Sequence, residues 1–145
     1  MIRLAGAALL AALVVLGACG GDDDDDVGET TMETTPEDDA FDLGVQSELR
    51  NGLTAAKTIA TDAGGRFVDA EGIPLDADDL AAVEPDVRFD RVVVEPEGAS
   101  IVLVKVSESG TAFCIAATSD GAVTYGADED PSNVDSIADC VDGSW

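Results

Sequence analysis

The fold is decided by VRFDRVVVEPEGASIVLVKVSESGTAFCIAATSDGAVTY, residues 87–125. This stretch contains four runs of strand-forming residues, at 87–95, 100–107, 111–118 and 122–125. Three short connections separate the runs, and each ends in a glycine suited to a hairpin turn. They are Pro96-Glu97-Gly98, Glu108-Ser109-Gly110 and Ser119-Asp120-Gly121. Short connections in succession predict a four-stranded antiparallel meander.

The second run predicts a central strand. Ile101-Val102-Leu103-Val104 is apolar at every position, so both faces of this strand should be buried. We expect a helix to cover one face and the C-terminal segment to cover the other. After Pro131-Ser132-Asn133 that segment has apolar residues at the spacing of a short helix, and Trp145 adds a large apolar group. The helically spaced residues are Val134, Ile137, Ala138 and Val141.

The segment before the strands has helical periodicity. Apolar residues recur at helical spacing from Phe41 to Ala63, and Gly64-Gly65 provides a stop, so we predict one amphipathic helix. In the connection that follows, Asp76 can cap a short helical turn and Pro85 prevents its continuation. About 105 residues are enough for one small domain. Residues 41–145 are therefore predicted to form a single α+β domain, with the helix packed on the meander.

Residues 1–18 have the pattern of an export signal. Arg3 precedes an apolar run over residues 4–16, which is shorter than the ~20 residues that a membrane-spanning helix needs. The run ends in Leu16-Gly17-Ala18-Cys19, which resembles the lipobox of bacterial lipoproteins. This resemblance implies that the signal is cut before Cys19, that the thiol carries a diacylglyceryl group and that the new amino group is acylated. The alternative is an ordinary secretory signal with a cysteine at its end.

The lipobox resemblance implies that lipid on Cys19 holds the protein on the extracytoplasmic side of the cell membrane. Residues 20–40 contain ten acidic residues and no Lys or Arg. They lack the apolar content to offset the entropy of ordering, so we predict that residues 19–40 form a disordered tether. A calcium or cationic-partner site at residues 22–26 is the alternative. Consecutive acids, however, lack the alternating ligands and the Gly turn of a calcium loop.

The charge of the chain limits its partners. The formal net charge is −24, which repels nucleic acid and anionic lipid headgroups, so we predict neither as a partner. A cationic protein or surface ligand is compatible with this charge. Adaptation to high salt produces the same excess of acids, because screening removes their mutual repulsion. The sequence leaves both explanations open.

The cysteines predict a structural disulfide. With Cys19 modified by lipid, Cys114 and Cys140 remain as an even pair in an exported and usually oxidising setting. A bond between them would restrain the unfolded chain by roughly 3 to 4 kcal/mol in the loop-entropy model. A redox or metal pair is the rival interpretation. It is disfavoured because the chain has no Cys-x-x-Cys spacing and no histidine.

The composition disfavours catalysis. Without histidine the chain has no Ser-His or Cys-His relay and no imidazole metal site. A pair of carboxylates could still serve as acid and nucleophile, but that mechanism needs a cleft and one carboxyl group with a raised pKa. We therefore predict a non-catalytic protein without a resident cofactor.

Two parts of the sequence resemble type IV pilins and pseudopilins. Residues 45–58, VQSELRNGLTAAKT, are similar to the end of the long pilin helix. Phe113-Cys114-Ile115-Ala116-Ala117, Tyr125, and Cys140 close to Gly143-Ser144-Trp145 resemble the pilin pattern in which a C-terminal disulfide staples the last loop onto the sheet. The resemblance implies a globular head in which a helix packs on an antiparallel sheet and the disulfide-bounded loop is exposed for contacts.

The departures from pilins limit what the resemblance implies. The lipobox and the acidic tether stand where pilins have a glycine-ended leader and a long apolar assembly helix. Filament assembly, motility and DNA uptake are therefore not expected.

The acids after the fourth strand-forming run are candidate calcium ligands. Some pseudopilins hold calcium in the corresponding C-terminal loop, which makes Asp128, Glu129, Asp130 and Asp135 candidates, with Asp139 nearby. The alternative is a solvated acidic loop, because this stretch lacks the Gly turn and the distal Glu of an EF-hand.

Together these patterns predict a lipid-anchored surface lipoprotein whose pilin-like domain has a non-catalytic binding or cell-envelope role. A calcium-dependent binding module and an accessory component of a type IV pilus or secretion apparatus are the alternatives.

Overall fold

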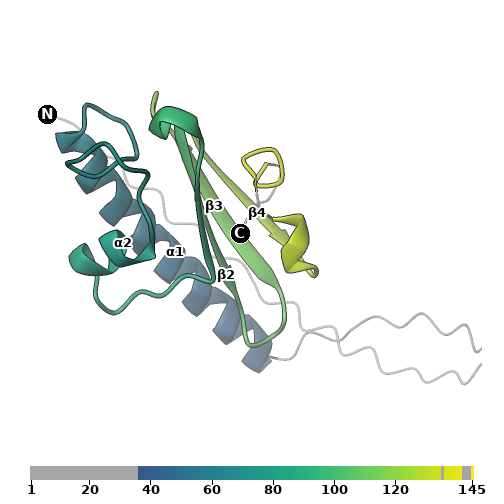
Figure 1. Cartoon of the computed structure of the whole chain (residues 1–145). Coiled ribbons are helices and arrows are strands. Elements are labelled where there is room, and N and C mark those ends of the chain that lie inside the picture. The colour runs from purple at the N-terminus through teal and green to yellow at the C-terminus, as the bar shows by residue number, and fades with distance from the viewer. Residues whose placement is uncertain (1–35, 135, 142–144) are drawn as a thin grey trace, which may run out of the picture. The chain divides into compact units, whose positions relative to one another are not determined.

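The computed structural model describes residues 36–134, 136–141 and 145 (Figure 1). A long helix comes first, a short helix follows, and four strands then run antiparallel in the order β1-β2-β3-β4. The elements are α1 (Pro36–Asp62), α2 (Ala77–Val83), β1 (Arg91–Val94), the 3₁₀ turn η1 (Pro96–Gly98), β2 (Ser100–Val106), β3 (Ala112–Thr118), β4 (Val123–Asp128) and the 3₁₀ turn η2 (Pro131–Asn133). The predicted α+β meander is confirmed.

Helix α1 begins at Pro36, five residues before the predicted start at Phe41. Proline is favoured in the first helical turn, where its missing N–H leaves no hydrogen bond unmade. The first turn also carries three acids, which the positive end of the helix dipole stabilises: Glu37, Asp38 and Asp39. Residues 36–40 therefore belong to the helix, and the prediction of a disordered tether was wrong for them. Phe41, the first residue of the apolar pattern that predicts the buried face of this helix, is 43% exposed.

The end of α1 is as predicted. Gly64 and Gly65 both have positive φ, a conformation that glycine adopts without strain. The N–H of Gly65 donates to the carbonyl of Ala60 at 2.7 Å, which satisfies a carbonyl of the last turn.

The three predicted hairpins are present. Their glycines Gly98, Gly110 and Gly121 all have positive φ, as tight turns require. Strand β1 is shorter than predicted, because residues 87–90 form a loop that packs on the helix. Strand β4 is longer and runs to Asp128, so its end takes up the residues predicted as the start of an acidic loop.

The sheet is buried on both faces, as the apolar second run predicted. Ile101 and Leu103 lie in the cluster that contains α1, whereas Val102 and Val104 lie in a second cluster on the opposite face. Helix α1 contacts the two central strands β2 and β3. The second cluster is closed by the C-terminal segment, which contributes Val134 and Cys140 and lies across the sheet from α1 (Figure 1).

The short C-terminal helix predicted around Val134 to Val141 is absent from the described residues. Among the described residues that follow β4, 3₁₀ structure is confined to η2, and residues 136–141 form turns and bends. The carboxylate of Asp139 accepts from the backbone N–H of Ser136 at 3.0 Å and from its hydroxyl at 2.6 Å, so side-chain bonds organise this turn. Val134 is nevertheless buried as predicted, and Cys140 is buried with it. Trp145, expected on the face opposite the helix, packs instead against the cluster that contains α1.

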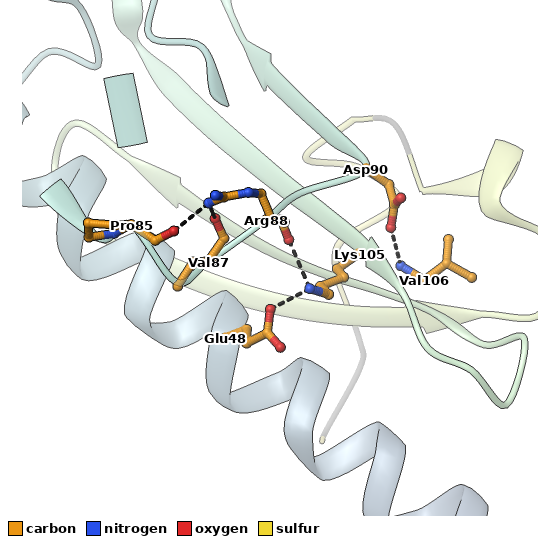
Figure 2. A network of polar contacts seen from close by, with 7 residues as sticks. All are labelled: Glu48, Pro85, Val87, Arg88, Asp90, Lys105 and Val106. Carbon is orange, nitrogen blue, oxygen red and sulfur yellow. Dashed lines mark hydrogen bonds and ion pairs between the residues drawn. The ribbon is translucent and has the colours of Figure 1, made fainter. Parts of the chain in front are cut away.

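The loop before β1 is attached to both the helix and the sheet (Figure 2). The Lys105 ammonium group forms an ion pair with Glu48 of α1 and donates to the carbonyl of Arg88 at 3.0 Å. The Asp90 carboxylate accepts from the N–H of Val106 at 2.7 Å. These contacts join α1, the loop and β2 around a single lysine.

The same loop places the Phe89 ring against α1 at Gly52. A Cβ atom at Gly52 would lie 2.0 Å from the tip of that ring. The missing side chain of Gly52 therefore provides the space for the ring.

Candidate functional site

An open groove lies between the end of α1, the connection to α2, and the end of α2. Its volume is about 760 Å³, within the usual range for ligand sites. The lining residues are Thr58, Ile59, Asp62, Ala63, Arg66, Val68, Asp69, Ala70, Glu71, Gly72 and Val83.

One wall of the groove is a small ribbon in which Val68 and Pro74 form an antiparallel bridge. The Asp69 carboxylate folds the turn of this ribbon, because one of its oxygens accepts from the N–H of Glu71 at 3.0 Å and of Ile73 at 2.7 Å. The N–H of Asp69 in turn donates to the carbonyl of Ile73 at 2.8 Å. This wall is therefore fixed by local hydrogen bonds.

The helical walls are fixed as well. Helix α2 begins with a capping box, in which the Asp76 carboxylate accepts from the N–H groups of Asp78 and Asp79 and the Asp79 carboxylate accepts from the N–H of Asp76. Leu80 of α2 is buried in the core, which holds this helix beside α1. The groove is thus preformed by capping, turn and core contacts.

The groove combines apolar surface with uncompensated charge. Ile59 and Val83 provide accessible apolar side chains, and Val83 is 41% exposed, whereas Val68 is buried. Within the described part of the chain, the carboxylates of Asp62 and Glu71 have no hydrogen bond or ion pair. This arrangement suits binding to a ligand that is partly apolar and partly charged.

The predicted disulfide is present. Cys114 of β3 and Cys140 are bonded, with their Cα atoms 5.9 Å apart and both residues fully buried. Gly126 of β4 makes room for the bond, because a Cβ there would lie 2.9 Å from the Cys114 sulfur and 2.9 Å from the carbonyl oxygen of Asp139. The bond therefore holds the C-terminal segment on the face of the sheet opposite α1.

The candidate calcium ligands are engaged in local structure. Asp128 accepts from the N–H of Asp130 at 2.7 Å and from the Asn133 side chain at 3.3 Å. The Ser132 hydroxyl and N–H, at 2.7 and 2.9 Å, hold the pKa of Asp130 below its ordinary value of 3.8. Glu129 is exposed, and Asp135 lies outside the described residues.

No cluster of three metal-ligating side chains is found over 36–134, 136–141 and 145. The four-residue calcium site, with Asp135 among its ligands, stays a prediction.

The lipidation residue Cys19 also lies outside the described residues. In the part of the chain that is described, no helix has the length and apolar content needed to cross a membrane.

Sequence reasoning did not find the groove. Residues 67–85 have no long periodic pattern, and the sequence predicts for them only a packed connection with a short helical turn capped by Asp76. The signals in the sequence were Gly72-Ile73-Pro74, which marks a turn, and the apolar residues Ile73 and Val83. In the structure both of these apolar side chains are exposed. Which helix this connection would pack against depends on tertiary structure.

Comparisons with profiles of known protein families, with curated proteins and with solved structures find no match to this chain.

Proposed function

We propose that this chain is a lipid-anchored protein of the extracytoplasmic side of the cell membrane, whose folded domain binds a partner without catalysis. The observation that carries the binding role is the preformed groove. Its walls are held by their own hydrogen bonds, and it presents exposed Val83 together with the carboxylates of Asp62 and Glu71, which have no partner among the described residues. A ligand would therefore meet a site that needs little ordering on binding.

The proposed location rests on the lipobox-like Leu16-Gly17-Ala18-Cys19. The bond between Cys114 and Cys140 supports it, because structural disulfides persist mainly in oxidising compartments. For the proposed pilin-like character, the support is the order of the elements, with a helix, a four-stranded meander and a C-terminal disulfide.

The anchoring is tested by Cys19→Ser in cells, with Cys114 and Cys140 left intact. The wild-type chain should incorporate labelled fatty acid and sediment with membranes, and protease added to intact spheroplasts should digest it. The variant should lose the label and leave the membrane fraction. A variant that stays bound to membranes would contradict the lipid anchor.

The binding role is tested by photo-crosslinking in cells, with a photoreactive residue placed at Val83 and, as a control, at exposed Glu108. Glu108 lies in the β2–β3 hairpin, outside the groove. We expect a discrete product from position 83 alone, and we expect Ile59→Glu to reduce it. Identical patterns from the two positions would exclude the groove as the binding site.

A further inference from the structure

The electrostatic field in the groove favours a cation. Three acids line it, Asp62, Asp69 and Glu71, against the single base Arg66 among the described lining residues. The 27-residue helix α1 also ends at the groove, and its last turn contains no basic residue to compensate the negative end of its dipole. A positively charged group would therefore be stabilised from several directions.

The groove also offers main-chain partners. Neither the N–H nor the C=O of Ala70 has a hydrogen-bond partner in the described part of the chain, and the Arg66 guanidinium group is unpaired there too. One N–H, one C=O and the donors of an arginine match the groups that an extended peptide backbone presents. Ile59 and Val83 line the same groove and offer contacts for an apolar side chain.

We infer that the groove binds an extended peptide segment of a partner protein that carries Lys or Arg next to a large apolar residue. This inference rests on the proposed binding role of the groove and names its class of ligand. A basic side chain would lie between Asp62 and Glu71, the apolar neighbour would contact Val83, and the peptide backbone would bond to Ala70. A second copy of this chain is a poor occupant, because each copy carries a net charge of −24.

The test uses the full chain in a nonionic detergent and a fluorescent, end-capped hexapeptide of alternating Lys and Leu. Two further peptides replace every Lys by Glu or every Leu by Ser. Fluorescence anisotropy gives the dissociation constants, and amide chemical shifts locate the contact. We expect the Lys-Leu peptide to bind about tenfold or more tightly than either counterpart, because each counterpart lacks one of the two complementary features.

Two double variants separate a local effect from a general effect of charge. Asp62→Asn with Glu71→Gln neutralises two acids in the groove, and Glu37→Gln with Glu108→Gln neutralises two exposed acids outside it. The groove variant should bind the Lys-Leu peptide about tenfold more weakly, whereas the control variant should change the affinity by less than about twofold. Circular dichroism and thermal melts confirm that both variants are folded.

Equal losses in the two double variants, or equal binding of the Lys and Glu peptides, would overturn the inference. Absence of peptide binding would overturn it as well. If the peptide does not bind, the photo-crosslink from position 83 is repeated in the Asp62→Asn, Glu71→Gln variant. A crosslink that persists there would support the proposed binding role of the groove, but with a ligand of another class. Failure of the crosslink itself would count against the proposed function.

Discussion

The guanidinium group of Arg50 lies over the indole ring of Trp145, with its central carbon 4.9 Å from the ring centroid. Arg50 also donates to the backbone carbonyl of Trp145 at 3.2 Å. The indole N–H donates to the carbonyl of Gly126 in the edge strand β4 at 3.0 Å. Trp145 therefore bonds to the edge strand of the sheet and to α1 at once.

The first prediction is that Trp145→Ala destabilises the domain by about 2 kcal/mol. The variant loses edge-to-face contacts with Phe113 and Tyr125, at centroid distances of 6.0 and 4.9 Å, together with the hydrogen bond to Gly126. Urea unfolding followed by circular dichroism measures the change. An unchanged midpoint would mean that the indole contacts contribute nothing to stability.

A milder substitution on the helix side provides the control. Arg50→Lys keeps the charge and removes the planar stacking, so we expect a loss of about 0.5 kcal/mol. Trp145 is the single tryptophan of the chain, and its emission reports directly on this contact. Arg50→Lys should shift the emission of the folded state while leaving that of the unfolded state unchanged.

The second prediction is that replacing glycine by alanine destabilises the domain at one position and stabilises it at another. At Gly126 the new Cβ would meet backbone atoms and the Cys114 sulfur at 2.9 to 3.0 Å, and neither can move freely, so we expect a loss of about 2 kcal/mol. At Gly44, in α1, nothing lies within 4 Å, and alanine should stabilise the helix by about 0.5 to 1 kcal/mol. Chemical denaturation of both variants is the measurement. A stable Gly126→Ala variant would contradict the close packing of the disulfide on β4.

The third prediction concerns the lysine at the centre of Figure 2. Lys105→Met should destabilise the domain by about 1 kcal/mol, because it removes the ion pair with Glu48 and the hydrogen bond to Arg88. Lys57→Met makes the same change of charge at an exposed side chain of α1 without such partners in the described residues, and it should have little effect. Equal losses in the two variants would show that net charge, rather than the contacts of Lys105, matters.

The fourth prediction is that the turns containing Asp120 and Asp130 lose stability at acid pH. The Thr118 hydroxyl and the N–H of Ala122 lower the pKa of Asp120 below 3.8, and the Ser132 hydroxyl and N–H do the same for Asp130. A lowered pKa in the folded state means that each carboxylate stabilises its turn above the unfolded pKa. This contribution is lost as the pH falls through the lower, folded pKa.

The measurement is an NMR titration of the two carboxyl groups from pH 6 to about pH 2. Ser132→Ala should raise the pKa of Asp130 toward its ordinary value and leave that of Asp120 unchanged. A pKa of Asp130 that does not respond to Ser132→Ala would exclude the hydroxyl as its cause.

Local patterns determined most of the fold. The glycine-ended turns set the hairpins, the apolar run 101–104 identified the central strand, and the helical stop at Gly64-Gly65 was correct. These features could be predicted because strand alternation and turn conformation depend on neighbouring residues. The prediction failed where longer-range contacts compete, as in the C-terminal segment. There Val134 and Cys140 are buried without a regular helix, since the disulfide and the sheet hold them.

The groove could not be predicted from the sequence. The sequence by itself predicted the strand order, the pairing of Cys114 with Cys140 and the acidic character of the chain. These follow from local turns, from the assignment of Cys19 to the lipobox-like motif, which leaves two cysteines, and from composition. Only the tertiary structure decided that Asp62, Glu71 and Val83 share one groove. They lie on three separate elements, and their proximity depends on the packing of α2 and the Asp69 turn against the end of α1, which no local pattern in the chain specifies.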